Sequence, residues 1–114
     1  VGILGSVDPN SLNPEKTTYA ERFFNVERIY VESATIVAVL QTMSDIDTSL
    51  RGEKMSPLDR TESQLVREYL ANALYTKNPR LITLAWVAYK NTIIKYDSTT
   101  YLLQKLAKIM APIL

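Results

Sequence analysis

The fold of this chain is decided by residues 78–98, which read NPRLITLAWVAYKNTIIKYDS. The stretch opens with Asn78-Pro79, a typical helix start, because asparagine accepts N–H groups of the first turn and proline suits the first helical position. The residues that follow are apolar on two sides of a helix. The small side consists of Leu81, Leu84, Ala85 and Ala88, and the bulky side of Ile82, Trp86, Tyr89, Ile93 and Tyr96. A helix that is apolar nearly all round is covered on both sides, so we expect residues 79–96 to form the central helix of a bundle.

Two further start signals flank this helix. Asp97-Ser98 is expected to cap a last helix over residues 98–111, and Ser56-Pro57 predicts the start of a helix over residues 56–77. The apolar residues of both segments recur three and four positions apart, as they do on the buried face of a helix. The second half of the chain is therefore expected to consist of three consecutive helices.

The first half carries one long helical pattern. Asn13-Pro14 predicts a helix start, and Gly52 is expected to end the segment as a left-handed residue, so the helix covers residues 14–51. At 1.5 Å per residue it would be about 55 Å long, so either it breaks or its first turns project beyond the bundle, and we favour a break or bend near Asn25. One apolar stripe consists of Tyr19, Phe23, Val26, Tyr30, Ser33, Val37 and Leu40, and a second of Ile29, Ile36, Met43 and Leu50. Three apolar residues outside both stripes are expected to be spare surface for partners, namely Val31, Val39 and Ile46.

No segment alternates between apolar and polar residues as a strand does, and residues 1–13 hold two of the three glycines and no period. The predicted fold class is all-α: an antiparallel helical bundle of four to five helices with no sheet. Its 114 residues, of which 46% are hydrophobic and 22% charged, suit a single domain over residues 1–114 with an irregular arm over 1–13. Because the sequence begins with Val1, we expect a processed or trimmed chain. The composition indicates no compartment.

Composition also narrows the chemistry. The chain has no cysteine and no histidine, which removes thiol nucleophiles, the usual general base at neutral pH and the commonest metal ligand. With three glycines there is no phosphate-binding loop of a familiar kind. We therefore expect a protein that is not an enzyme and has no catalytic, cofactor-binding or metal-binding residues. No apolar run reaches the length of a membrane span, so no transmembrane segment is expected.

Two sets of acidic residues could suggest a site and are interpreted as solvated helix surface. Asp45, Asp47 and Ser49 stand at the first, third and fifth positions of a calcium loop, but the required glycine and glutamate are replaced by Leu50 and Ser56. The carboxylate pairs Glu27 with Glu32 and Asp59 with Glu62 have basic neighbours, Arg28 and Arg60, as exposed helix charges usually do.

Apolar residues at both ends of the chain favour an interaction protein. Such ends must fold back onto the body or be buried in a partner. The predicted partner interface combines the two ends with the two-faced helix, and consists of Val1, Ile3, Leu4, Trp86, Tyr89, Ile109, Met110, Ile113 and Leu114. We expect a non-enzymatic structural or assembly subunit that binds protein partners or copies of itself.

The charge distribution supports an alternative. Residues 1–70 contain seven basic and eleven acidic side chains, whereas residues 71–114 contain six basic and one acidic. Basic side chains interleaved with aromatic ones are used to bind nucleic acid, the cations contacting phosphates and the rings contacting bases. The alternative function is a nucleic-acid-binding helical protein, such as a small subunit of a ribonucleoprotein complex. Its expected phosphate contacts are Lys90, Lys95, Lys105 and Lys108.

Overall fold

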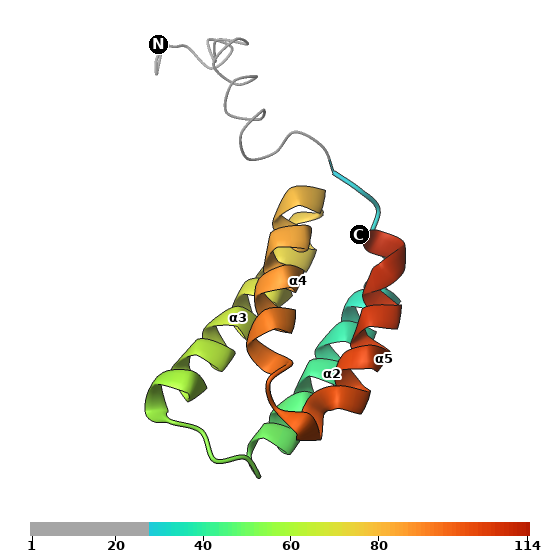
Figure 1. Ribbon diagram of the computed structural model, residues 1–114. Coiled ribbons are helices and arrows are strands. Elements are labelled where there is room, and N and C mark those ends of the chain that lie inside the picture. Colours follow the sequence, from blue (N-terminus) through green and yellow to red (C-terminus); the bar gives the residue numbers. More distant parts are fainter. Residues whose placement is uncertain (1–27) are drawn as a thin grey trace, which may run out of the picture.

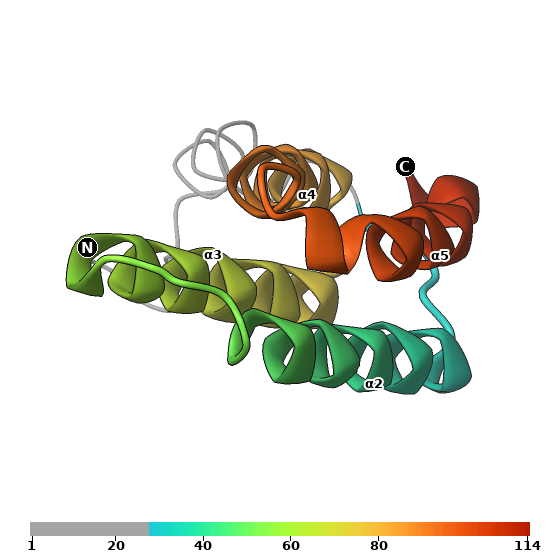
Figure 2. The same ribbon diagram turned by 60° about the horizontal axis from the view of Figure 1, so that its bottom comes forward.

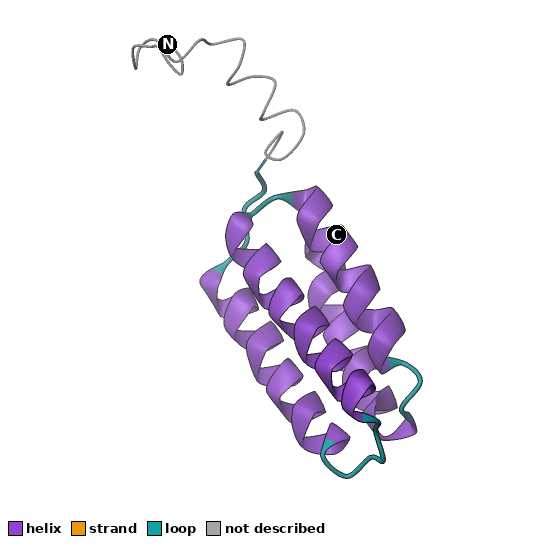
Figure 3. Ribbon diagram, turned by 90° about the vertical axis from the view of Figure 1, so that its left-hand side faces the viewer, coloured by secondary structure: helices purple, strands orange, loops and turns teal. Residues whose placement is uncertain are grey.

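The computed structural model describes residues 28–114, which form an up-and-down bundle of α-helices (Figure 1). The helices are α2 (Ser33–Leu50), α3 (Pro57–Thr76), α4 (Pro79–Ile93) and α5 (Thr100–Met110), with short 3₁₀ turns at Asp97–Thr99 and Ala111–Ile113. Consecutive helices run in opposite directions, and the described part of the chain contains no strand (Figure 3). The predicted all-α antiparallel bundle is confirmed. The predicted arm over residues 1–13 and the predicted break near Asn25 lie outside the described residues.

Two of the predicted helix starts are confirmed by their capping hydrogen bonds. The Ser56 hydroxyl accepts the Asp59 N–H at 3.0 Å, and the Asn78 side-chain carbonyl accepts the N–H groups of Arg80 and Leu81 at 2.9 and 3.3 Å. In each case proline takes the first helical position. These bonds satisfy N–H groups that no helical carbonyl can reach, so both starts are local properties of the sequence.

The predicted helix over residues 14–51 is wrong over residues 28–32, where the backbone is not helical and α2 begins only at Ser33. Tertiary hydrogen bonds hold this stretch. The Ile29 N–H donates to the Lys77 carbonyl at 2.8 Å, and the Lys77 ammonium donates to the Val31 carbonyl at 3.1 Å. These bonds tie the stretch to the α3–α4 junction, and Val31 is buried there. The apolar residues keep a helical spacing through residues 28–32, but the hydrogen bonds to Lys77 hold the backbone in a non-helical conformation.

The closest helix packing is between α3 and α4 and between α2 and α5. The turned view shows α4 over α3 and α5 over α2, with α3 beside α2 and α4 beside α5 (Figure 2). The core lies between them and is built mainly from aliphatic side chains, with one tryptophan and one tyrosine from α4. The α2–α3 and α4–α5 pairs pack less closely than the other two.

Burial on α2 follows the second predicted stripe rather than the first. Ile36, Met43 and Leu50 are buried, whereas Tyr30 and Val37 are 84% and 63% exposed. The spare surface positions are also corrected, because the structure buries all three of them in the core: Val31, Val39 and Ile46. Two neighbouring helices, α3 and α5, cover α2, and the buried arc is therefore wider than one stripe.

The helix predicted over residues 79–96 is present as α4 (Pro79–Ile93), but it is one of four outer helices and not a central one. Its bulky side is buried, but α4 ends at Ile93 and exposes Leu84 and Val87 on its outer surface. The last helix also starts without the predicted Asp97-Ser98 cap, since no side-chain capping bond forms there. Instead the buried Thr99 hydroxyl donates to the carbonyls of Tyr96 at 2.7 Å and Ile93 at 3.2 Å, which closes the turn between α4 and α5.

The left-handed residue that the sequence placed at Gly52 is found elsewhere. No described glycine has a positive φ, and α2 ends in ordinary right-handed turns. Lys77, after α3, has φ 58° and ψ 15°. The chain reverses between α3 and α4 within Lys77 and Asn78, and a left-handed residue after α3 makes so short a connection possible.

Candidate functional site

An apolar groove separates α4 from α5. It has a volume of about 190 Å³ and is lined by Trp86, Lys90, Ile94, Thr100, Leu103, Gln104 and Ala107. Trp86 and Leu103 are core residues, whereas Ile94 is 61% exposed. A groove of this kind between two helices suits an apolar side chain or the apolar face of another helix.

Three residues of the predicted partner interface are core residues, which corrects that prediction. Trp86, Tyr89 and Met110 are 5%, 1% and 0% exposed, because the bulky side of α4 and the end of α5 face the bundle interior. They stabilise the fold and offer no free surface. The remaining described members are Ile109 and Ile113, which are partly buried, and Leu114, which is 52% exposed. Val1, Ile3 and Leu4 lie outside the described residues.

A stripe of exposed apolar side chains, which the sequence did not single out, follows α3. Leu58, Leu65 and Tyr69 are 77%, 61% and 39% exposed. Their spacing of seven and four places them on one side of the helix. Leu84 of α4 is 59% exposed and also lines a shallow hollow over the first turns of α4. Large leucines exposed in a row are uncommon on a surface that only water covers.

The four lysines predicted to bind nucleic acid are not brought together on one face. Lys90 lines the α4–α5 groove, and Lys95, after α4, lies 4.0 Å from the Asp59 carboxylate of α3 and over the Tyr96 ring. Lys105 and Lys108 are exposed on α5, three residues apart. Lys90 is on α4, whereas Lys95 lies in the turn that follows it, beside α3.

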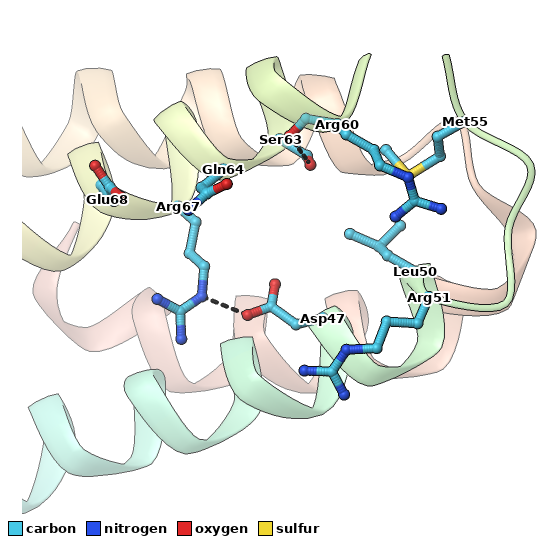
Figure 4. A pocket seen from close by; sticks show the side chains of 9 residues that line it. All are labelled: Asp47, Leu50, Arg51, Met55, Arg60, Ser63, Gln64, Arg67 and Glu68. Carbon is cyan, nitrogen blue, oxygen red and sulfur yellow. Dashed lines mark hydrogen bonds and ion pairs between the residues drawn. The ribbon is translucent and has the colours of Figure 1, made fainter. Parts of the chain in front are cut away.

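Three arginines line one cavity within residues 1–70, the part of the chain that has a net negative charge. A cavity of about 280 Å³ between the end of α2 and the start of α3 is lined by Asp47, Leu50, Arg51, Met55, Arg60, Ser63, Gln64, Arg67 and Glu68 (Figure 4). Arg67 Nε lies 2.6 Å from Asp47 Oδ2, and Arg60 donates to the Glu53 carbonyl at 3.2 Å. The Asp47–Arg67 ion pair joins α2 to α3 across the cavity, where few other contacts do.

The charges around this cavity affect two ionisable groups. Burial raises the pKa of Asp47 above its ordinary value, although Arg67 and Arg51 act in the opposite direction. Burial also raises the pKa of Tyr89, and the Asp47 carboxylate raises it further. The Tyr89 hydroxyl is buried and has no hydrogen-bond partner. Tyr89 is therefore a neutral phenol at neutral pH, buried close to the ion pair.

A spacing signal for the arginine cavity was present in the sequence. Asp47 and Arg51 are four residues apart on α2, and Arg60 and Arg67 are seven apart on α3, so each pair lies on one helix face. A short connection makes the two helices antiparallel neighbours. Counting charges over halves of the chain hid this cluster, because the nearby carboxylates cancelled it.

The acidic residues weighed in the sequence are dispersed in the structure. Asp47 is engaged by Arg67, Asp59 lies near Lys95, and Glu32 and Glu62 are exposed, whereas Glu27 lies outside the described residues. Within residues 28–114, no three side chains of the metal-ligating kinds come together. Over the same residues, no helix combines the length and the apolar character needed to cross a membrane.

The chain thus presents an apolar groove, an exposed apolar stripe and an arginine-lined cavity on different sides of one bundle. No protein-family model, no curated protein and no solved structure matches it.

Proposed function

We propose that the protein is a non-enzymatic assembly subunit that binds a protein partner through the outer side of the α3–α4 hairpin. The observation that carries the proposal is the exposed apolar stripe of Leu58, Leu65 and Tyr69, together with Leu84 of α4. The interface predicted from the sequence included Trp86, Tyr89 and Met110, but these residues are buried in the core, and we propose the exposed stripe in their place. Apolar contacts on a rigid helical scaffold are a usual basis of protein–protein association.

The register of the hairpin supports treating these residues as one surface. Its ends are set by the connection at Lys77 and Asn78 and by the approach of Asp59 to Lys95 at 4.0 Å. In an antiparallel pair with this register, Tyr69 is level with Ala85, the neighbour of Leu84. The cavity residues mark the side of α3 that faces α2, and the stripe lies on the opposite side at 100° per residue. The stripe therefore borders α4.

The test is a pull-down with the full-length tagged protein from its source material, run with nuclease, comparing wild type with Leu65→Glu and Leu84→Glu. A carboxylate at the centre of an apolar contact must be desolvated, so each variant is expected to lower partner recovery by at least tenfold, as loss of roughly 1.4 kcal/mol or more would. Both residues are exposed, so the helix content measured by circular dichroism should not change.

Tyr75→Glu is the matched control, because Tyr75 is a 60% exposed aromatic on another side of α3. Recovery with this variant should equal that of wild type. If Leu65→Glu and Leu84→Glu also retain all partners, the stripe is not the interface and the proposal fails.

The nucleic-acid alternative receives less support, since Lys90 lines the α4–α5 groove whereas Lys95 lies beside Asp59 of α3. The same pull-down tests it. Partners that are lost on nuclease treatment, with nucleic acid in the untreated eluate, would favour the alternative over assembly through protein contacts.

A further inference from the structure

The α4–α5 groove is apolar and open to solvent. Its most deeply buried lining residues are Trp86 and Leu103, which are 5% and 6% exposed, whereas Ile94 on its wall is 61% exposed. The groove starts beside the turn between the two helices and extends along α4 from Ile94 to Trp86, about 12 Å by helical rise. This length is two turns of a helix, so the groove suits the apolar face of a short helical stretch.

Each of the two helices brings a lysine to this groove. Lys90 lines it from α4. Lys108 of α5 is exposed and follows the lining residue Gln104 by four positions, so it continues the same side of α5. Neither lysine forms an ion pair with a carboxylate of residues 28–114. Since α4 and α5 contain no acidic residue, the groove favours an occupant whose apolar stripe has acidic groups on both sides.

The apolar stripe on α3 has this chemistry. Leu65, at its centre, is 61% exposed, and Glu62 and Glu68 stand three residues before and after it. At 100° per residue, the two glutamates project about 60° to either side of Leu65. Both glutamates are exposed, whereas Arg60 and Arg67 line the cavity that faces α2. The outer side of α3 is therefore an apolar ridge with an acidic residue on each flank.

The spacing of the charges on the two surfaces also agrees. Glu62 and Glu68 are about 9 Å apart along the axis of α3. Ile94 and Thr100 both line the groove next to the turn, so in this antiparallel pair Lys108 is level with Trp86. The lysines are then about 6 Å apart along the groove, on opposite rims. The length of lysine and glutamate side chains covers the remaining difference.

We infer that the partner bound by the α3 stripe is a second copy of this chain, and that the α4–α5 groove of that copy receives the stripe. This inference rests on the proposed function, since it names the occupant of the same stripe. The stripe and the groove are different surfaces, so each copy offers its stripe to one neighbour and its groove to another. Such head-to-tail contacts continue into a ring or a filament and do not stop at a dimer.

Sedimentation velocity of the purified full-length chain tests the inference. A contact of two helical turns is small, so the Kd is expected between roughly 10 μM and 1 mM, and the measurement covers this range. Wild type should form species larger than a dimer as its concentration rises. Leu65→Glu in the stripe and Ile94→Glu in the groove should each raise the Kd at least roughly tenfold. Val37→Glu, at a 63% exposed position on α2, is the matched control and should assemble as wild type does.

Charge reversal tests the pairing of the two surfaces. The groove variant carries Lys90→Glu and Lys108→Glu. The stripe variant carries Glu62→Lys and Glu68→Lys. Each variant alone should associate at least roughly tenfold more weakly than wild type, because like charges then face each other. An equal mixture of the two should assemble again, since every stripe then meets a groove of opposite charge. A mixture that does not assemble, a wild type that stops at a dimer, or a wild type that stays monomeric up to roughly 1 mM would each overturn the inference.

The pull-down described above separates this inference from the proposed function. If it recovers a different protein in a manner that depends on Leu65, while the purified chain stays monomeric, the stripe is an interface but its occupant is not a second copy. If neither partner recovery nor self-association responds to Leu65→Glu, the proposed function and this inference both fail.

Discussion

The two loosely packed sides of the bundle are filled by opposite chemistry. Between α2 and α3 the space is bridged by the Asp47–Arg67 ion pair, with two further arginines around it. Between α4 and α5 there is no such bridge, and the space is lined mainly by apolar side chains. The charged lining is favourably hydrated, and its ion pair already joins the two helices. Contact of an apolar lining with water is unfavourable, and covering that lining lowers the free energy of the molecule.

The ion pair on one side and the groove on the other contribute differently to the stability of the bundle. The ion pair is one-third exposed on both partners, so it joins two helices at modest energetic value and requires no ligand. The groove instead offers surface whose burial would stabilise the molecule. The comparison shows that an ion pair bridges the α2–α3 side, whereas the α4–α5 side is left as an open apolar groove.

The largest expected change in the free energy of unfolding comes from Trp86, which lines the groove and is also part of the core. Trp86→Ala should lower the free energy of unfolding by about 3–5 kcal/mol, because it removes a large, 5% exposed side chain from the interior. Val37→Ala, at a 63% exposed position on α2, should change it by less than about 0.5 kcal/mol. Urea denaturation followed by circular dichroism measures both. A small loss for Trp86→Ala would mean that Trp86 is not part of the core.

A smaller effect concerns the interior between the two sides. Tyr89→Phe should raise the free energy of unfolding by about 1 kcal/mol, because the buried Tyr89 hydroxyl makes no hydrogen bond. Burial raises the pKa of Tyr89 above its ordinary value of 10.0, so above pH 10 the unfolded chain loses this proton first and stability falls. The variant should lose that part of the alkaline sensitivity. Tyr101→Phe, at a 76% exposed position, is the control, and destabilisation by Tyr89→Phe would contradict the argument.

The smallest effect tests the charged side through pH. Burial raises the pKa of Asp47 above 3.8, so just above that pH the folded protein holds a proton that the unfolded chain has lost. The stability of wild type relative to Asp47→Asn should therefore fall as pH rises from 3.8 through the raised pKa, by less than about 1 kcal/mol. Urea denaturation of both proteins across this range measures the difference, with Glu62→Gln as an exposed control. A difference that grows with pH would show that attraction to Arg67 outweighs burial.

The parts of the fold that could be predicted were those whose cause lies within a few residues. Asn78 and Ser56 cap their helices through bonds to residues two or three positions away, so each start was readable from the sequence. The prediction of an Asp97-Ser98 cap was wrong. The turn is closed instead by the buried Thr99 hydroxyl, which donates to the carbonyls of Tyr96 and Ile93.

The candidate surfaces were predicted less well. The sequence analysis predicted an apolar partner interface that included Trp86 and Tyr89, the bulkiest apolar residues of α4, which the neighbouring helices cover. A large apolar side chain is the best candidate for a core as much as for an interface. Only the arrangement of helices leaves Leu65 and Leu84 exposed while burying the others.

By itself the sequence determined the class of the fold, its antiparallel helices and two of the helix starts, because hydrophobic period, proline position and capping bonds act over one or two turns. The tertiary structure decided the rest. It made α2 begin only at Ser33 through hydrogen bonds between Lys77 and residues 29 and 31, buried Val39 and Ile46, and joined Asp47 to Arg67. Each of these depends on contacts between residues twenty or more positions apart or on which helices flank a face, and spacing along the chain does not specify either.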